Sequence, residues 1–112
     1  MEIITTAQQC LGVFPYRDDE GRPFTRGDGS PVEYVQLQDP ETGEIRRWTI
    51  APGVDGARDT LADGFGRLFT IRARARLVEK TVYTRGGADY VQRREKIEVI
   101  GAQPVEQGKA RG

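Results

Sequence analysis

The chain of 112 residues contains no histidine, one cysteine, one methionine and one tryptophan. Without histidine, Ser-His catalytic arrangements and most zinc sites are excluded, and the single Cys10 cannot form an internal disulfide. No apolar run approaches the roughly 20 residues that span a bilayer, and the N-terminus lacks the basic start and apolar stretch of a signal peptide. We therefore expect a cytoplasmic, non-catalytic protein that needs no membrane, no metal and no small-molecule cofactor.

Charge is balanced overall, with 17 basic and 17 acidic residues, but it is unevenly distributed along the chain. Residues 1–56 contain 5 Lys/Arg and 10 Asp/Glu, whereas residues 57–112 contain 12 and 7. A basic surface on an otherwise neutral domain suits a polyanionic partner. The length fits one domain, which we place at residues 1–104, followed by a flexible tail at residues 105–112.

The first part of the chain predicts strands interrupted by a long polar segment. Residues 10–16 are apolar and predict an edge strand, because Pro15 has no N–H for a central ladder. Residues 1–6 would extend this strand or form one of their own. Residues 17–31 contain three glycines and two prolines and predict an exposed loop or a loose hairpin.

A first antiparallel hairpin is predicted from residues 32–38 and 45–50, which flank a turn at residues 39–44. The register that faces Val35 with Trp48 separates an apolar face from a polar face that contains an aromatic ring. The apolar face comprises Val35, Leu37, Trp48 and Ile50, and the polar face comprises Tyr34, Gln36, Arg47 and Thr49.

A short helix and a second hairpin are predicted in the remainder of the chain. Residues 57–65 fit one or two helical turns, ended by Gly64 and Gly66. Residues 68–83 are the longest extended pattern and return through a turn into residues 90–100. Centring that turn pairs Ala75 with Ile97 and Ala73 with Val99 inside, and Arg74 with Glu98 and Arg76 with Lys96 outside. After Gly101 the sequence shows no periodicity.

The order of these elements is a strand, a hairpin, a short helical connection and a second hairpin. It predicts an all-β fold, a five-stranded antiparallel barrel of the oligonucleotide-binding (OB, Greek-key) type with long β-hairpin loops and one short helix. An SH3-like barrel or a split β-roll would give nearly the same order.

Three arginines occupy every second position of the longest extended pattern, so Arg72, Arg74 and Arg76 share one face of a strand. One interpretation is a solvated face with an ion pair between Arg74 and Glu98, worth about 0.2–1 kcal/mol. The other is a phosphate-binding row, because Arg76 opposite Lys96 is a like-charge pair that a polyanion would relieve.

Aromatic residues near these basic residues suggest base stacking. Proteins that bind single strands combine a basic groove with exposed rings on which bases stack, at about 1–3 kcal/mol per base. Tyr34 lies on the polar face of the first hairpin, and Phe24 lies in the polar loop. Tyr83 and Tyr90, on either side of Arg85 at the second turn, are either stacking residues or a stabilising cross-strand pair.

A family resemblance is carried by five segments in order: Gly21-Arg-Pro-Phe24, Glu33-Tyr-Val-Gln-Leu-Gln-Asp39, Arg46-Arg-Trp-Thr-Ile50, Gly66-Arg-Leu-Phe-Thr-Ile71 and Lys96-Ile-Glu-Val-Ile100. Together they resemble the small helix-destabilising proteins of filamentous phages and related plasmids, over roughly residues 21–104. The resemblance implies a dimeric OB-type barrel that coats single-stranded DNA during DNA replication.

Carried over by position, the resemblance makes Arg22, Phe24 and Arg26 loop contacts to DNA. It makes Tyr34 a stacking residue and Arg47 a phosphate contact. The loop departs from the family pattern in its acidity, and the net charge is lower than is usual for a coating protein. The acidic loop residues are Asp18, Asp19, Glu20 and Asp28.

The sequence therefore predicts a homodimer that binds single-stranded DNA, with RNA as the alternative, through phosphate neutralisation and base stacking with little sequence specificity. The alternative function is a non-catalytic protein-interaction or structural module of a phage or mobile-element assembly. The candidate nucleic-acid-binding residues are Arg22, Phe24, Arg26, Tyr34, Gln36, Arg47, Arg72, Arg74, Arg76, Tyr83, Arg85, Tyr90 and Arg94.

Overall fold

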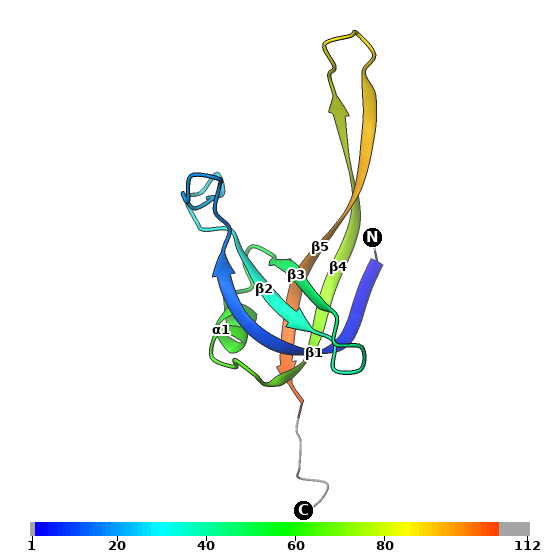
Figure 1. The fold of residues 1–112 in the computed structure, drawn as a ribbon. Coiled ribbons are helices and arrows are strands. Elements are labelled where there is room, and N and C mark those ends of the chain that lie inside the picture. The colour runs from blue at the N-terminus through cyan, green and yellow to red at the C-terminus, as the bar shows by residue number, and fades with distance from the viewer. Residues whose placement is uncertain (1, 106–112) are drawn as a thin grey trace, which may run out of the picture.

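The computed structural model describes residues 2–105, which form five strands and one helix. The strands close into a barrel in the order β1-β2-β3-β5-β4, with β4 paired back onto β1 (Figure 1). This is the five-stranded barrel expected of the OB type. The elements are β1 (Glu2–Pro15), β2 (Glu33–Gln38), β3 (Ile45–Ile50), α1 (Asp55–Ala62), β4 (Leu68–Val82) and β5 (Tyr90–Pro104).

The barrel is mixed rather than purely antiparallel, and in this respect the prediction is wrong. β3 pairs with β5 in parallel, through Thr49 with Glu98 and Ile50 with Val99. Hairpin patterns identify strand neighbours within each hairpin, but they carry no information about the junction where two hairpins meet. The helical connection between β3 and β4 allows the two strands at that junction to run in the same direction.

The registers of both hairpins are confirmed. Val35 pairs with Trp48 in β2 and β3, and the four predicted pairs of β4 and β5 are all present. Burial follows the same alternation, because an inward side chain is removed from water at every second position. The predicted apolar face of the first hairpin is buried, and so are Phe69, Ile71, Ala73, Ala75 and Val99.

β1 is longer and more central than its sequence suggests. It runs without interruption from Glu2 to Pro15 and pairs with both β2 and β4, so the expected edge strand is wrong. Pro15 is the last residue of the strand, where a missing N–H disrupts little of the ladder. The register shifts near Gly12, which adopts a φ of 120° with the ring of Phe14 packed over it. Glycine meets both requirements, since it tolerates positive φ and leaves room for the ring.

β5 also extends beyond its predicted end. It continues through Gly101, which lies opposite Arg72, to Pro104, and the Val105 N–H donates to the Leu68 carbonyl. A register shift beside Arg72 accommodates one extra residue and obscures the alternation in the sequence. Of the predicted tail at 105–112, residues 106–112 lie outside the described residues.

α1 packs against one end of the barrel (Figure 1). It spans Asp55–Ala62 instead of the predicted 57–65, and its Leu61 side chain is fully buried in the core. The buried thiol of Cys10 donates to the Leu61 carbonyl at 3.3 Å, and burial raises the pKa of this thiol. Cys10 is therefore a packing residue. No helix in the described part of the chain is long and apolar enough to cross a membrane.

Two segments project from the barrel: the loop between β1 and β2, and the end of the β4–β5 hairpin (Figure 1). Among residues 2–105, β4 and β5 pair only with each other beyond Ala75 and Ile97. The β1–β2 loop is more ordered than the predicted loose segment. It folds into two tight turns, held by bridges between Arg17 and Pro23 and between Thr25 and Pro31.

Candidate nucleic-acid interface

An aromatic cluster of Phe14, Tyr16 and Tyr34 lies on the outer surface of β1 and β2. The ring centroids of Phe14 and Tyr34 are 5.7 Å apart, and those of Tyr16 and Tyr34 are 4.7 Å apart. The pairing of Phe14 with Tyr34 places these two rings on the same side of the sheet. The Thr49 hydroxyl on β3 donates to the Tyr16 hydroxyl at 3.3 Å. The cluster is therefore held from three strands, which limits the entropy lost when a base stacks on it.

The outer face of β2 and β3 combines this cluster with a guanidinium. Arg47 is exposed, and its guanidinium carbon lies 5.5 Å from the Tyr34 ring centroid. Gln36 is paired with Arg47 across the hairpin. A planar cation above an aromatic ring keeps its charge available to a phosphate while it orders the ring below. The predicted polar face of the first hairpin is thus confirmed, and it brings Tyr34, Gln36 and Arg47 together.

A groove of about 620 Å³ lies beside this face, between β3 and the base of the β4–β5 hairpin. Tyr16, Trp48 and Thr49 are among its lining residues. Four basic residues and one acidic residue, Glu95, also line it, so the local potential favours a polyanion. The basic residues are Arg47, Lys80, Arg94 and Lys96.

The cations of the groove form no ion pair with the acidic residues that the structure describes. Within residues 2–105, no carboxylate lies within ion-pairing distance of Arg47, Lys80, Arg94 or Lys96. A charge without an intramolecular counter-ion gains most from a phosphate. The arginines that do form ion pairs are Arg22, Arg46, Arg58, Arg74, Arg76 and Arg93.

The arginine row on β4 is partly neutralised from within the protein. Arg74 and Arg76 reach the same carboxylate oxygen of Glu98, at 3.4 and 3.3 Å, and the Glu98 side chain is only 4% exposed. This carboxylate also relieves the like-charge pairing of Arg76 with Lys96. The predicted ion pair of Arg74 with Glu98 is confirmed, whereas Arg72 lies exposed opposite Gly101.

The β1–β2 loop presents Phe24 to solvent, with half of its surface exposed. The Phe24 N–H donates to the Tyr16 carbonyl, and the Val32 N–H donates to the Phe24 carbonyl. These bonds place the backbone of Phe24 next to that of Tyr16, a member of the aromatic cluster. Arg22 is held at 3.1 Å from Asp18 and 2.8 Å from Glu20, which satisfies much of its charge.

The predicted residues at the second turn lie away from the others. Tyr83 and Arg85 belong to the connection after β4, and Tyr90 begins β5. Tyr90 pairs with Val82 rather than Tyr83, so the predicted cross-strand tyrosine pair is absent from the register. The pair of Val82 with Tyr90 lies seven residue steps from the pair of Ala75 with Ile97, which corresponds to roughly 23 Å along the ribbon. These residues could touch only a ligand that runs along the hairpin.

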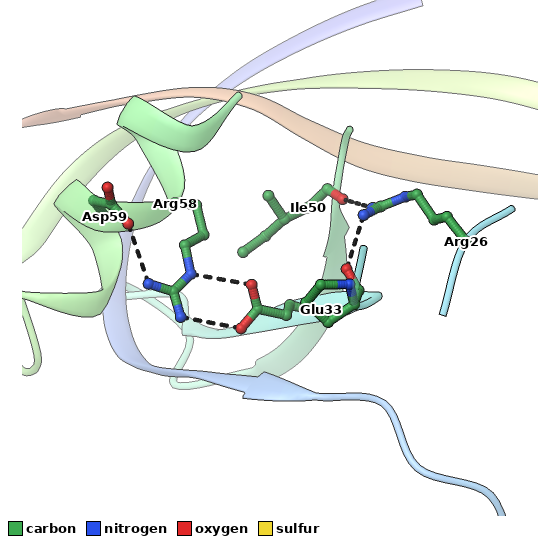
Figure 2. Close-up of polar contacts among 6 residues, drawn as sticks. Arg26, Glu33, Ile50, Arg58 and Asp59 are labelled. Atoms are coloured by element: carbon green, nitrogen blue, oxygen red, sulfur yellow. Dashed lines mark hydrogen bonds and ion pairs between the residues drawn. The ribbon is translucent and has the colours of Figure 1, made fainter. Parts of the chain in front are cut away.

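A second hollow, of about 610 Å³, lies between the β1–β2 loop and α1. Glu33 accepts two hydrogen bonds from Arg58, at 3.0 and 3.1 Å, and Arg58 also contacts Asp59 (Figure 2). These two carboxylates raise the pKa of Arg58 further above its ordinary value. With Asp28 and Asp55 also lining it, the hollow has four carboxylates and two arginines and would repel a polyanion.

Phe14, Tyr16, Lys80 and Lys96 belong to this surface but were not among the predicted site residues. Phe14 and Tyr16 were assigned only to an apolar strand, although their spacing of two places both rings on one face. That spacing, combined with the closeness of both residues to the β1–β2 loop, was the available signal. Thr49 was placed on the polar face of the first hairpin, and Lys80 continues the alternation of the arginine row on β4. The groove that joins them was not predictable, because it depends on how β3 and the second hairpin meet.

Comparisons of the chain with protein-family models, with curated proteins and with solved structures find no match. The surface itself therefore carries the functional argument.

Proposed function

We propose that this protein binds single-stranded nucleic acid across the outer face of β2 and β3 and the adjoining groove. The observation that carries the proposal is the combination of an aromatic cluster with four cations that have no acidic partner among residues 2–105. Bases would stack on exposed rings while the cations neutralise phosphates. The strand-2 and strand-3 face of OB barrels suits this use in general.

Binding of this kind reads little sequence. Stacking accepts any base, and phosphates are the same at every position. Gln36, Gln38 and Thr49 are the amide and hydroxyl residues that alternation places on the outer face beside Tyr34, which leaves few directional contacts to base edges. We propose single-stranded DNA as the ligand, with RNA as the comparison, and no catalytic step.

The test compares two groove cations, Arg47 on β3 and Lys96 on β5, with a cation on the opposite face of the β4–β5 hairpin. An oligo-dT titration can be followed by the fluorescence of Trp48, the single tryptophan, which lines the groove. The double variant Arg47→Ala, Lys96→Ala should reduce the salt slope of the affinity by about 1.4, at about 0.7 per phosphate contact. Arg93→Ala is the control, because Arg93 pairs with Glu79 and faces away from Lys96. If the double variant and the control lose equal affinity and salt slope, the groove is wrongly assigned as the binding face.

A second candidate function is a protein-interaction module, favoured by the apolar side chains of the projecting hairpin. Leu77 is 72% exposed and Val91 is 55% exposed, on the face opposite to Arg76 and Lys96. A two-stranded ribbon gains stability when its apolar residues are covered. Light scattering over a range of protein concentrations, without nucleic acid, tests this candidate and the proposed homodimer. If the protein is a monomer at every concentration, self-association and the homodimer are both excluded.

A further inference from the structure

Arg26 makes a two-pronged contact that ties the β1–β2 loop to the barrel. Its Nη1 donates to the Pro31 carbonyl at 2.8 Å, and its Nη2 donates to the Ile50 carbonyl at 2.8 Å. Figure 2 shows the Arg26 guanidinium directed at the carbonyl of Ile50, at the end of β3. One end of the guanidinium thus closes the second turn of the loop, and the other fixes this turn to a strand 24 residues away in sequence.

The same turn is ordered from within. The Arg26 N–H donates to the Ser30 carbonyl, and Asp28 accepts hydrogen bonds from both the N–H and the hydroxyl of Ser30. These bonds to Asp28 lower its pKa. Such local bonds shape the turn, whereas the Arg26 side chain joins the turn to β3. This contact is therefore a second anchor for the loop, beside the backbone bonds of Phe24 to Tyr16 and Val32.

The charge around Arg26 argues against direct contact with a phosphate. Its guanidinium lies in the hollow that also contains Asp28, Glu33 and Asp59, where a polyanion is repelled. Both terminal nitrogens already donate to carbonyls. A phosphate would have to displace bonds that are already formed.

We propose that Arg26 is a positioning residue that acts through Phe24. By fixing the second turn to β3, Arg26 holds the loop so that Phe24 stays next to the aromatic cluster, available to a base. This inference rests on the proposed function, and it replaces the direct DNA contact expected from the sequence for Arg26. The contribution of Arg26 to affinity then requires Phe24 and does not depend on salt.

Three variants separate positioning from phosphate contact in an oligo-dT titration. Arg26→Ala should weaken binding about tenfold, within the range for loss of one base stack, and leave the salt slope unchanged. Arg26→Lys keeps the charge but lacks the planar fork, so it should resemble Arg26→Ala. In a Phe24→Ala background, Arg26→Ala should have no further effect on affinity. A slope reduced by about 0.7, or full retention of affinity in Arg26→Lys, would identify a phosphate contact and overturn the proposal.

Hydrogen exchange of the free protein tests the anchor independently of any ligand. The amides of Phe24 and Val32 are bonded within the loop ladder and should exchange faster in Arg26→Ala, whereas amides of β4 should not. Arg22→Ala is the matched control in the same loop, since the ion pairs of Arg22 are with Asp18 and Glu20 of the loop itself. Unchanged exchange at Phe24 and Val32 in Arg26→Ala would refute the anchor. If the wild type binds no oligonucleotide while the exchange result holds, the proposed function fails and the anchor stands.

Discussion

Replacement of Glu98 by glutamine should destabilise the protein and yet strengthen its binding to single strands. Glu98 lies on the outer face of β5, and its carboxylate oxygen contacts Arg74 at 3.4 Å and Arg76 at 3.3 Å. Glutamine has nearly the same volume, so the substitution removes the charge without creating a cavity. The two guanidiniums would then lose their shared counter-ion.

The expected loss of stability lies between two limiting cases. Removing one partner of a fully buried ion pair costs about 3–5 kcal/mol, whereas exposed pairs contribute about 0.2–1 kcal/mol. The Glu98 side chain is 4% exposed, but Arg74 and Arg76 are 31% and 49% exposed and can regain water. We therefore expect a loss of about 2 kcal/mol in the free energy of unfolding. For a chain of 112 residues this lowers Tm by about 8 °C, at roughly 2.1 cal/mol/K of unfolding entropy per residue.

The effect on binding should have the opposite sign. Glu98→Gln removes one negative charge from the outer surface and frees Arg74 and Arg76 to bind phosphates. The salt slope of the affinity should therefore steepen by about 0.7–1.4. Thermal unfolding and an oligo-dT titration at several salt concentrations measure the two effects. An unchanged Tm would show that the ion pairs contribute nothing, and weaker binding at low salt would refute the electrostatic account of this face.

Two further predictions concern packing and pH. A Cβ at buried Gly64 would overlap the ring of Phe69, so Gly64→Ala should lower the free energy of unfolding by about 1–3 kcal/mol. The loss should be smaller in a Phe69→Leu background. An unchanged free energy of unfolding for Gly64→Ala in chemical denaturation would contradict this packing. Hydrogen bonds lower the pKa of Asp18 and of Asp28 below the ordinary value of 3.8, so their contribution to loop order is complete above that value and is lost as the pH falls through the depressed pKa values. Amide NMR shifts of the β1–β2 loop should be constant above about pH 5 and change below about pH 4, and a change centred near neutral pH would exclude these carboxylates.

The elements that alternate regularly were predictable from the sequence, and those that depend on the meeting of distant segments were not. Both hairpin registers followed from the requirement that Val35, Trp48 and their neighbours share a buried face. The parallel pairing of β3 with β5 did not, because no local pattern encodes it. The end of β5 was missed because the register shift beside Arg72 interrupts the alternation.

In the candidate site, the residues that share one hairpin face were predictable, whereas the contacts of the loop arginines were not. Tyr34 and Arg47 followed from the hairpin register and lie together, as expected. Arg22 and Arg26 share a loop in the sequence with Phe24, but their guanidiniums turn to loop carboxylates and to backbone carbonyls. A residue type that suits phosphate binding equally suits an ion pair or a bond to the backbone, and only the folded chain distinguishes these uses.

The most direct test of the central claim is fluorescence anisotropy of a labelled oligo-dT. A length of about 20 nucleotides exceeds the usual site of one OB-type domain, and a duplex and an oligo-U of equal length serve as comparisons. The account predicts binding to the single strand that weakens steeply between low and moderate salt, weaker binding to the duplex, and quenching of Trp48. Absence of binding to the single strand even at low salt, or equal affinity for the duplex, would contradict it.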